Sequence, residues 1–293
     1  NFDAFLNGIF ERVQSLIDYV QRVIGYRFAG TISEQYLFIL IGDRANCKST
    51  FVNVINKLLG DYSKAASFQT LVAKGSSSIG DDLVDLVSAR LISVSETEAG
   101  EALAEAKIKQ MTGGDVLKGR PLYGSWLEFS IIGKIFLATN SLPQINNTDH
   151  GIWRRIQAIP FNRTFSAEEQ DKDLGVKLTA ELPGILNWAI RGCLDWQQQG
   201  LNPPQVVLDQ VSAYKTEMDS IAEFIDHECS VEADLKYPAA KLYEAYRHYC
   251  QAIGRKPQST NAFKKALDKL ANVYQSRSSS GIQWHGIQPV IHL

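Results

Sequence analysis

Two spacings of hydrophobic residues alternate along the chain, one typical of buried strands and the other of amphipathic helices. Short apolar runs predict four buried strands, at residues 36–41, 90–95, 134–139 and 155–159. Helical stretches separate these runs, beginning with residues 50–59. Buried strands that alternate with helices are typical of a parallel sheet with helices on both faces. The pattern therefore predicts an α/β core.

Both flanks of this core show helical patterns. Residues 2–24 carry apolar side chains at helical spacing and predict one amphipathic lead-in helix. Downstream, Ser166–Glu169 has the form of a capping box and predicts the start of a helix, as does Pro183. A third helix is predicted from Pro203 towards Cys229. We therefore expect the core to be followed by a helical linker or lid.

The last segment of the chain has a different order of elements. Its pattern predicts a helix at 239–252, a turn at Gly254, a helix at 261–271, and strands at 273–277 and 282–285 that are joined by 278–281. Helix, helix and hairpin is the order of a winged-helix module. The sequence thus predicts a C-terminal winged-helix-like module.

Composition places the chain among ordinary globular proteins. Of its 293 residues, 45% are hydrophobic and 21% charged, and no apolar run is long enough to span a bilayer. Because no secretion signal is recognisable either, we expect a cytoplasmic protein without a membrane partner. None of the four cysteines is spaced as CxxC, which favours reduced thiols over a zinc site. The chain starts with Asn, so we expect further sequence upstream.

Charge is distributed unevenly along the chain. The formal net charge is only −2, but residues 236–277 hold nine Lys or Arg against Glu244 and Asp268, a local net charge of +7. A basic face on a mildly acidic chain is expected of a module that contacts DNA. A solvated helix face would give the same count. Within this stretch, Lys264 and Lys265 are our candidates for DNA contact.

The first predicted strand leads into a phosphate-loop motif. Residues 42–49 match G-x-x-x-x-G-K-[ST] at every fixed position except Cys47, where glycine is expected. In such loops backbone N–H groups hold phosphates, the lysine reaches the β and γ oxygens, and the hydroxyl binds Mg²⁺. The predicted ATP-binding residues are Gly42, Asp43, Arg44, Ala45, Asn46, Cys47, Lys48, Ser49 and Thr50.

Cys47 is the unusual member of this loop. If the position requires a positive φ, a side chain there costs on the order of 1–2 kcal/mol. The residue also lies at the predicted N-terminus of a helix and beside Lys48. Both features favour a thiolate, so the sequence predicts a lowered pKa for the Cys47 thiol.

Polar residues follow the second and third strands, where an ATPase needs them. Glu96 and Glu98 come directly after residues 90–95, and Asn140 follows residues 134–139. One acid can complete the Mg²⁺ shell and the other can orient the attacking water, with Asn140 beside it. The alternative is that the acids open the next helix and that Asn140 is a turn residue. We predict Mg²⁺ at Ser49 and Glu96.

These motifs occur in a fixed order that resembles one family. The order is Gly42–Phe51, Glu96–Glu98, Ile108–Asp115, Arg120–Tyr123, Ala138–Asn140, Gly151–Ile156 and Pro160–Phe161, followed by Glu223–Phe224, Leu242–Tyr246 and Trp284–Gly286. It resembles the superfamily-three helicase domain of phage, plasmid and poxvirus-type primase-helicases over nearly the whole chain. Arg44 and Cys47 depart from the resemblance, because the family usually has glycines there.

The resemblance implies a fold, a ligand and an assembly. It implies an AAA+-like P-loop core that uses ATP and Mg²⁺, in a homo-oligomeric ring, expected to be a hexamer. Such a ring would translocate on single-stranded DNA at forked DNA, with a primase or polymerase domain upstream in the same polypeptide. By position, Arg155 would be the arginine finger that completes a neighbour's site, with Arg154 as the adjacent candidate.

The resemblance also implies a DNA-binding hairpin within residues 116–129. Lys118 and Arg120 would grip the phosphate backbone there, and Tyr123 or Trp126 would stack on it or brace it. Taken alone, Trp126 is more readily interpreted as a core residue. We expect four parts in the chain: an N-terminal helical segment (1–30), a P-loop core (31–165), a helical linker or lid (166–220) and the winged-helix-like module (221–293).

The sequence therefore favours an ATP-dependent DNA helicase, and two alternatives remain. One is a ring or monomer that binds DNA without productive hydrolysis, because the phosphate loop is altered. The other is a metabolic P-loop kinase, which is disfavoured because no phosphoacceptor lid is recognisable. A DNA-stimulated ATPase assay separates the first two.

Overall fold

The computed structural model describes residues 1–72, 81–95, 101–121, 124–145, 150–255, 257–278 and 281–290. The chain forms two compact units. The first contains the described residues up to Gln144 and those from His150 to Tyr214, and the second begins at Lys215 and also includes Ile145. Each unit is described by itself below.

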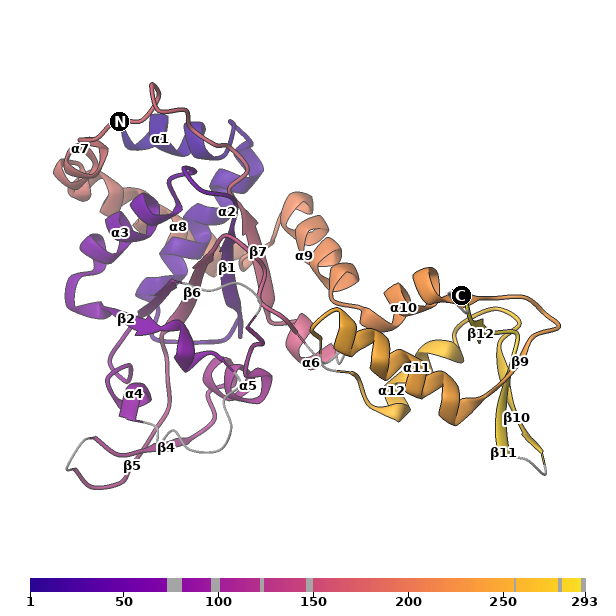
Figure 1. Cartoon of the computed structure of the whole chain (residues 1–293). Helices are drawn as coiled ribbons and strands as arrows, with labels where there is room; N and C mark the ends of the chain where they lie inside the picture. Colours follow the sequence, from indigo (N-terminus) through magenta and orange to yellow (C-terminus); the bar gives the residue numbers. More distant parts are fainter. Residues whose placement is uncertain are drawn as a thin grey trace. The chain divides into compact units, whose positions relative to one another are not determined.

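The first unit is built on a parallel sheet of five strands (Figure 1). Its order is β2-β3-β6-β1-β7, with β1 Leu37–Ile41, β2 Ser63–Ser67, β3 Leu91–Ser95, β6 Lys134–Thr139 and β7 Ile156–Pro160. All four strands predicted from apolar runs are confirmed. The fifth, β2, has the sequence Ser-Lys-Ala-Ala-Ser, and because it lies at the sheet edge it needs no buried run.

Helices pack on the sheet, and the predicted α/β fold is confirmed. One face of the sheet, with Phe38 and Leu40 of β1, shares a hydrophobic core with α1 (Phe2–Ile9), α2 (Gln14–Gly25), α3 (Lys48–Leu59), α7 (Leu174–Ala180) and α8 (Leu182–Gln199). Alternate residues such as Ile39 point to the opposite face and are fully buried as well. The short helices α4 (Asp81–Val84), α5 (Glu105–Gly113) and α6 (His150–Trp153) complete the unit.

The flanking helices break more often than the sequence predicts. The expected single helix over residues 2–24 is two helices, because Glu11 and Arg12 adopt positive φ values of 51° and 62° between α1 and α2. The helix start expected at Ser166 is wrong. The backbone N–H of Ser166 does donate to the Glu169 carboxylate (3.0 Å), but this bond closes a turn. Residues 166–173 are exposed, so no apolar face supports a helix before α7.

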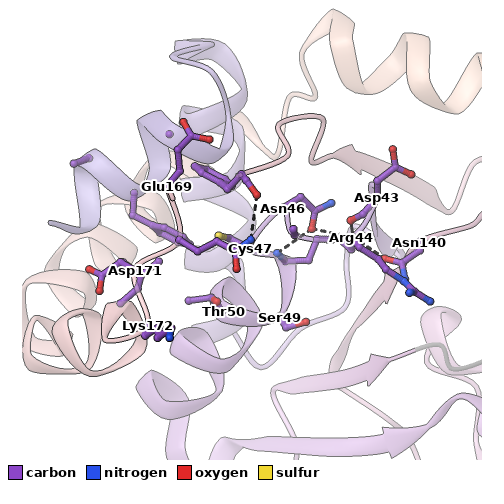
Figure 2. Close-up of a pocket in the computed structure, with 18 residues that line it drawn as sticks. Asp43, Arg44, Asn46, Cys47, Ser49, Thr50, Asn140, Glu169, Asp171 and Lys172 are labelled. Carbon is purple, nitrogen blue, oxygen red and sulfur yellow. Dashed lines mark hydrogen bonds between the residues drawn. The ribbon is translucent and has the colours of Figure 1, made fainter. Parts of the chain in front are cut away.

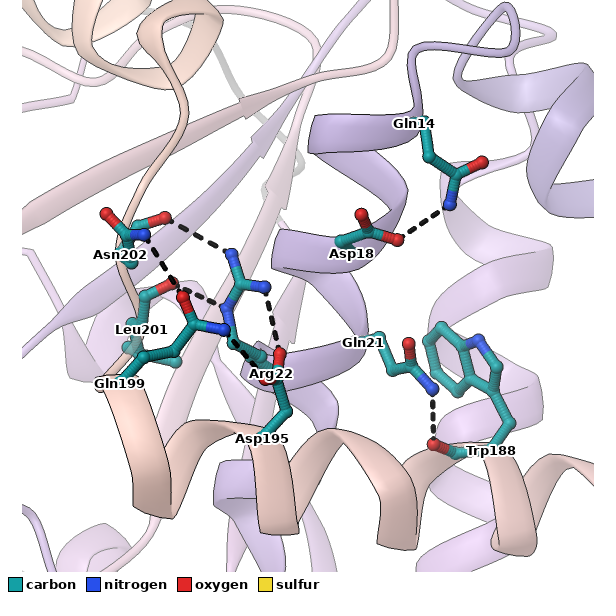
Figure 3. Close-up of polar contacts among 9 residues, drawn as sticks. All are labelled: Gln14, Asp18, Gln21, Arg22, Trp188, Asp195, Gln199, Leu201 and Asn202. Carbon is teal, nitrogen blue, oxygen red and sulfur yellow. Dashed lines mark hydrogen bonds and ion pairs between the residues drawn. The ribbon is translucent and has the colours of Figure 1, made fainter.

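Helices α2 and α8 pack closely against each other, and polar side chains of both helices form hydrogen bonds beside this interface (Figure 3). The Arg22 guanidinium of α2 is buried, and each of its nitrogens donates one hydrogen bond: to the Leu201 carbonyl (2.9 Å), the Asn202 carbonyl (3.2 Å) and the Asp195 carboxylate of α8 (3.0 Å). A buried charge is tolerated when its hydrogen bonds are satisfied in this way.

The second unit has its own core beneath a small sheet. Its helices are the end of α9 (Gln205–Glu217), then α10 (Ser220–Glu228), α11 (Ala239–Ala252) and α12 (Thr260–Leu267). Its sheet has the order β10-β11-β9, with β10 Tyr274–Ser278, β11 Gly281–His285 and β9 Lys236–Pro238; β8 (Cys229–Ser230) pairs with β12 (Gln288–Pro289). The two predicted strands are confirmed as β10 and β11, and helix α11 has its predicted bounds. The third helix predicted from Pro203 is instead split into α9 and α10, because Asp219 caps α10.

No helix in the described part of the chain is both long enough and apolar enough to cross a bilayer.

Candidate nucleotide-binding site

The phosphate loop connects β1 to α3 and bends through two residues with positive φ. Ala45 has φ 59° and Cys47 has φ 63° with ψ 14°, the left-handed region that favours glycine. The sequence analysis considered a positive φ at Cys47, and the structure confirms that the residue has one. Gly42 is needed for a different reason, because a Cβ there would lie 2.2 Å from the Phe161 carbonyl oxygen.

Lys48 is buried at the centre of this loop. Its ammonium donates to the carbonyl oxygens of Gly42 and Asp43 (2.9 Å to the latter), to Asn46 Oδ1 (3.0 Å) and to Asn140 Oδ1 (3.1 Å). Asn46 is itself held by the Phe161 carbonyl (3.1 Å). Burial lowers the pKa of Lys48, while the nearby Asp43 charge opposes this shift. The loop therefore holds one cation among oxygens that a bound anion could replace.

A cleft of about 580 Å³ opens on this loop, which is a size typical of small-molecule sites. Figure 2 shows the loop residues Asp43 to Cys47 on one side of it, with Glu169, Asp171 and Lys172 on the other. Ser49 and Thr50 of α3 also line the cleft, and Ser49 is exposed to it. Eight of the nine predicted ATP-binding residues line this cleft, and Gly42 does not.

The remaining walls of the cleft were missed by sequence reasoning. They come from α1, through Ala4, Phe5 and Gly8, and from the segment between Phe165 and Leu174. No local motif marks these residues as ligand-binding. They reach the cleft only because α1, α3 and α7 pack together in the same core.

The strand order brings the carboxyl ends of β1, β3 and β6 to one edge of the sheet. Strand β6 lies between β1 and β3, with Ile41 paired to Thr139 and Ser95 paired to Ala138. The carboxyl ends of all three strands therefore meet at the phosphate loop, where Asn140 contacts Lys48. Glu96 and Glu98 follow Ser95 in sequence but lie outside the described residues.

The Cys47 thiol does not match its predicted chemistry. Burial raises the pKa of Cys47, and the positive charge of Arg163 only partly opposes this. The thiol packs against the hydrophobic core, and this loss of hydration disfavours the thiolate. The expectation of a lowered pKa is therefore wrong.

The two candidate finger residues have different environments. Arg155 is 8% exposed, and it donates to Thr112 Oγ1 (3.1 Å) and to the Gly151 carbonyl (2.7 Å). Arg154, next to it, is exposed. Both precede β7 at the amino end of the sheet. The phosphate loop lies at the carboxyl end, roughly 16 Å away for five strand residues. Neither side chain can therefore reach the cleft of its own unit.

The predicted hairpin is present in residues 117–129. Strands β4 (Leu117–Gly119) and β5 (Leu127–Phe129) pair in antiparallel fashion, and Lys118 forms an exposed ion pair with Glu128 (2.9 Å). Trp126 is 62% exposed with the Arg120 guanidinium 5.8 Å from its ring centre, so the core interpretation of Trp126 is wrong. Tyr123 lies outside the described residues.

In the second unit, Lys264 and Lys265 are both exposed on α12. The flanking apolar residues Phe263 and Leu267 are buried, so the helix presents a basic outer face. Contact of these two lysines with DNA stays a prediction.

Comparison with known proteins identifies relatives of both units. Residues 216–286 match the family model described as "Poxvirus D5 protein-like". A protein of Acanthamoeba polyphaga mimivirus, provisionally named a helicase, is 28% identical over 242 residues, and a provisionally named helicase of Frog virus 3 (isolate Goorha) is 25% identical over 248 residues. The resemblance to a D5-type superfamily-three helicase domain is confirmed. The matched regions cover 75% and 77% of this chain, which spans about a quarter of each relative.

Solved structures support the same fold. The apo structure of the C-terminal region of NrS-1 has a TM-score of 0.57 and 10% identity, and the alignment covers 98% of this chain and 74% of that one. A second apo structure of the same region gives a TM-score of 0.56, also at 10% identity, with 98% and 75% covered. At this identity the likeness concerns the fold alone. The chain therefore combines a helicase-like sequence with an α/β fold that is found in a solved structure.

Proposed function

We propose that this chain is the ATP-dependent motor of a DNA helicase. The observation that carries the proposal is the position of Lys48. Its ammonium lies between the phosphate loop and Asn140 at the end of β6, and Lys48 lines a nucleotide-sized cleft. Relatives named as helicases support the same activity. The proposal includes single-stranded and forked DNA as partners and an upstream primase or polymerase domain.

The loop residues fit a nucleotide and its metal. A phosphate at the N-terminus of α3 would meet backbone N–H groups of the first helical turn, and Lys48 would exchange its carbonyl partners for phosphate oxygens. Ser49 is exposed in the cleft and would bind Mg²⁺ together with Glu96. Glu98 and Asn140 would orient the attacking water. ATP and Mg²⁺ are thus the proposed cofactors.

We assign the arginine finger to Arg154. A finger must reach the nucleotide of an adjacent subunit, and so its guanidinium must be accessible. Arg154 is exposed, whereas Arg155 is bonded to Thr112 and Gly151 within its own subunit. Arg155 is then a positioning residue that fixes the start of β7. This assignment requires a ring, for which a hexamer is our proposal.

The hairpin β4-β5 is the proposed DNA contact of the core. Lys118 and Arg120 supply positive charge, and the exposed Trp126 ring offers a surface on which bases can stack. Lys264 and Lys265 would contact DNA from the second unit. The Lys118 ammonium is paired with Glu128, and so DNA must compete with this exposed ion pair.

The test is hydrolysis by Lys48→Ala. This variant should lose DNA-stimulated ATP hydrolysis while it keeps its fold, because Lys48 is the loop's cation for the β and γ phosphates. Circular dichroism and thermal unfolding check the fold. Unchanged turnover in Lys48→Ala would refute the site assignment.

A second function is favoured by one observation, the strained Cys47 in the loop. A ring that holds DNA and nucleotide without hydrolysis would fit that departure. In that case the wild-type chain would bind ATP but show no DNA-stimulated turnover. The same assay therefore decides between a motor and a binding ring.

A further inference from the structure

The outer face of the sheet β10-β11-β9 carries an unusual row of side chains. Directly paired residues of antiparallel strands lie on the same face. Tyr274 pairs with His285, and His285 pairs with Lys236, so these three residues form one row across all three strands. The three strands lie side by side in Figure 1. The next row contains Ser276 and Gln283.

This face is separate from the core of its unit. Trp284, adjacent to His285, points the other way and is 1% exposed, with Gln275 and Tyr237 as its cross-strand partners. The inner face therefore supplies the hydrophobic core of the unit. Tyr274, by contrast, is 58% exposed, and Lys236 is exposed on the other side of His285.

Two aromatic rings on the outer face stack parallel to each other. The rings of Tyr274 and His285 stack with a centroid distance of 4.7 Å and an interplanar angle of 2°. A hydrogen bond of 2.7 Å between Ser276 Oγ and His285 Nε2 fixes the orientation of the His285 ring. The Tyr274 ring is thus supported from one side, and much of its surface remains in contact with solvent.

We propose that this face binds an unpaired nucleotide strand, with a base stacked on Tyr274. A flat, supported ring with one open side is what base stacking requires. Lys236, in the same row, can neutralise a backbone phosphate of the bound strand. The site is distinct from the α12 lysines. It rests on the proposed function for its ligand, DNA.

Charge around the row favours stacking as the main source of affinity. Residues 236–277 are strongly basic, which suits a polyanion. However, Glu232 and Asp234 lie just before Lys236 and are exposed, so they weaken the local attraction for phosphate. Binding at this face should therefore depend on bases more than on phosphates.

The experiment compares two oligomers of equal length on the whole 293-residue chain. One is fluorescently labelled oligothymidylate, and the other has the same phosphates with abasic sites in place of the bases. Fluorescence anisotropy is measured without nucleotide at fixed salt. Tyr274→Ala should bind oligothymidylate about 5- to 100-fold more weakly, the effect expected for loss of one stacked base. Tyr274→Phe should stay within about twofold of wild type, because the ring is kept.

The abasic oligomer separates stacking from charge. Tyr274→Ala should bind it as the wild type does, whereas the double variant Lys264→Ala/Lys265→Ala should weaken the binding of both oligomers alike. Equal oligothymidylate affinity of Tyr274→Ala and wild type overturns the stacking site while leaving the proposed function in place. If the wild type binds neither oligomer, both proposals fail together.

Discussion

At the scale of single residues, the amino end of the parallel sheet contains cations that the proposed motor does not use. Arg27 is fully buried with its guanidinium against the rings of Phe38 and Phe136, 4.5 Å and 3.8 Å from their centres. Its guanidinium nitrogens have no hydrogen-bond partner among the residues that the structure describes. Lys134 is buried nearby, where its ammonium donates to the Ala29 carbonyl and lies 4.5 Å from the Tyr26 ring centre.

Burial, together with the charges of Arg27 and Arg90, lowers the pKa of Lys134 to about 7. An unfolded lysine has a pKa of about 10.4. Between these values the unfolded chain binds a proton that the folded chain has released, so stability should rise with pH above 7. We predict that wild type gains stability over Lys134→Met between pH 7 and 9, by up to about 1.4 kcal/mol per pH unit.

Urea unfolding at several pH values measures this difference, and subtracting the variant removes the other titrating groups. Tyr26 does not interfere, because burial raises its pKa above the usual value of a tyrosine. Parallel curves for wild type and Lys134→Met would contradict the prediction. They would mean that Lys134 keeps its proton in the folded protein.

The Cys47 thiol gives a second prediction at this scale. Because burial raises its pKa, the thiolate fraction should keep growing up to at least pH 9. Alkylation of Cys47 by iodoacetamide, followed by mass spectrometry, should accelerate about tenfold per pH unit between pH 7 and 9. ATP should slow the reaction, since Cys47 lines the cleft. A rate that levels off below pH 8 would instead indicate the activated thiolate that the sequence suggested.

At the scale of elements, the sequence predicts what depends on local pattern. Strands β1, β3, β6 and β7 were predictable because each is a short apolar run, and α11 because its apolar residues recur at helical spacing. Strand β2 was not, since an edge strand exposed on several residues needs no such run. The break at Glu11 and Arg12 was missed for another reason. Neither residue favours a positive φ, so tertiary packing rather than local preference sets it there.

The α2–α8 contact depends on glycine in a way that can be tested. A Cβ on Gly192 would lie 2.1 Å from the Gln21 carbonyl oxygen of α2, whereas a Cβ on Gly184 of the same helix would meet nothing within 4 Å. Gly192→Ala should therefore lower the free energy of unfolding by about 1–3 kcal/mol, because the helices must separate. Gly184→Ala is the matched control and should raise it by a few tenths to about 1 kcal/mol. Equal effects in urea unfolding would exclude the close contact as the cause.

At the scale of the whole molecule, the site is assembled from segments that the sequence keeps far apart. The phosphate loop, Lys48 and Asn140 were predictable, because each follows a recognisable strand and parallel strands end at one edge. The walls from α1 and from residues 165–174 were not, because only the packing of α1 and α7 beside α3 brings them to the loop. The choice between Arg154 and Arg155 also required burial, since two adjacent arginines are equivalent in the sequence.

That choice leads to a prediction about assembly. Arg154→Ala should keep nucleotide binding and stability but lose hydrolysis, because in the proposed ring its guanidinium would act on a neighbour's ATP. Arg155→Ala is the matched control: it removes the bonds to Thr112 and Gly151 from a buried site and should lower the free energy of unfolding. Urea unfolding and nucleotide binding distinguish the two variants.

Mixing then tests whether the ATP site is shared between subunits. Lys48→Ala subunits lack the loop cation but keep Arg154, and Arg154→Ala subunits have the reverse. In an equal mixture about a quarter of the interfaces join an intact loop to an intact finger, so part of the hydrolysis should return. Differently tagged subunits, purified through one tag and detected by the other, establish that the two variants assemble together. If such mixed assemblies form and remain as inactive as either variant alone, Arg154 does not act across an interface, and the ring model for this chain loses its main structural support.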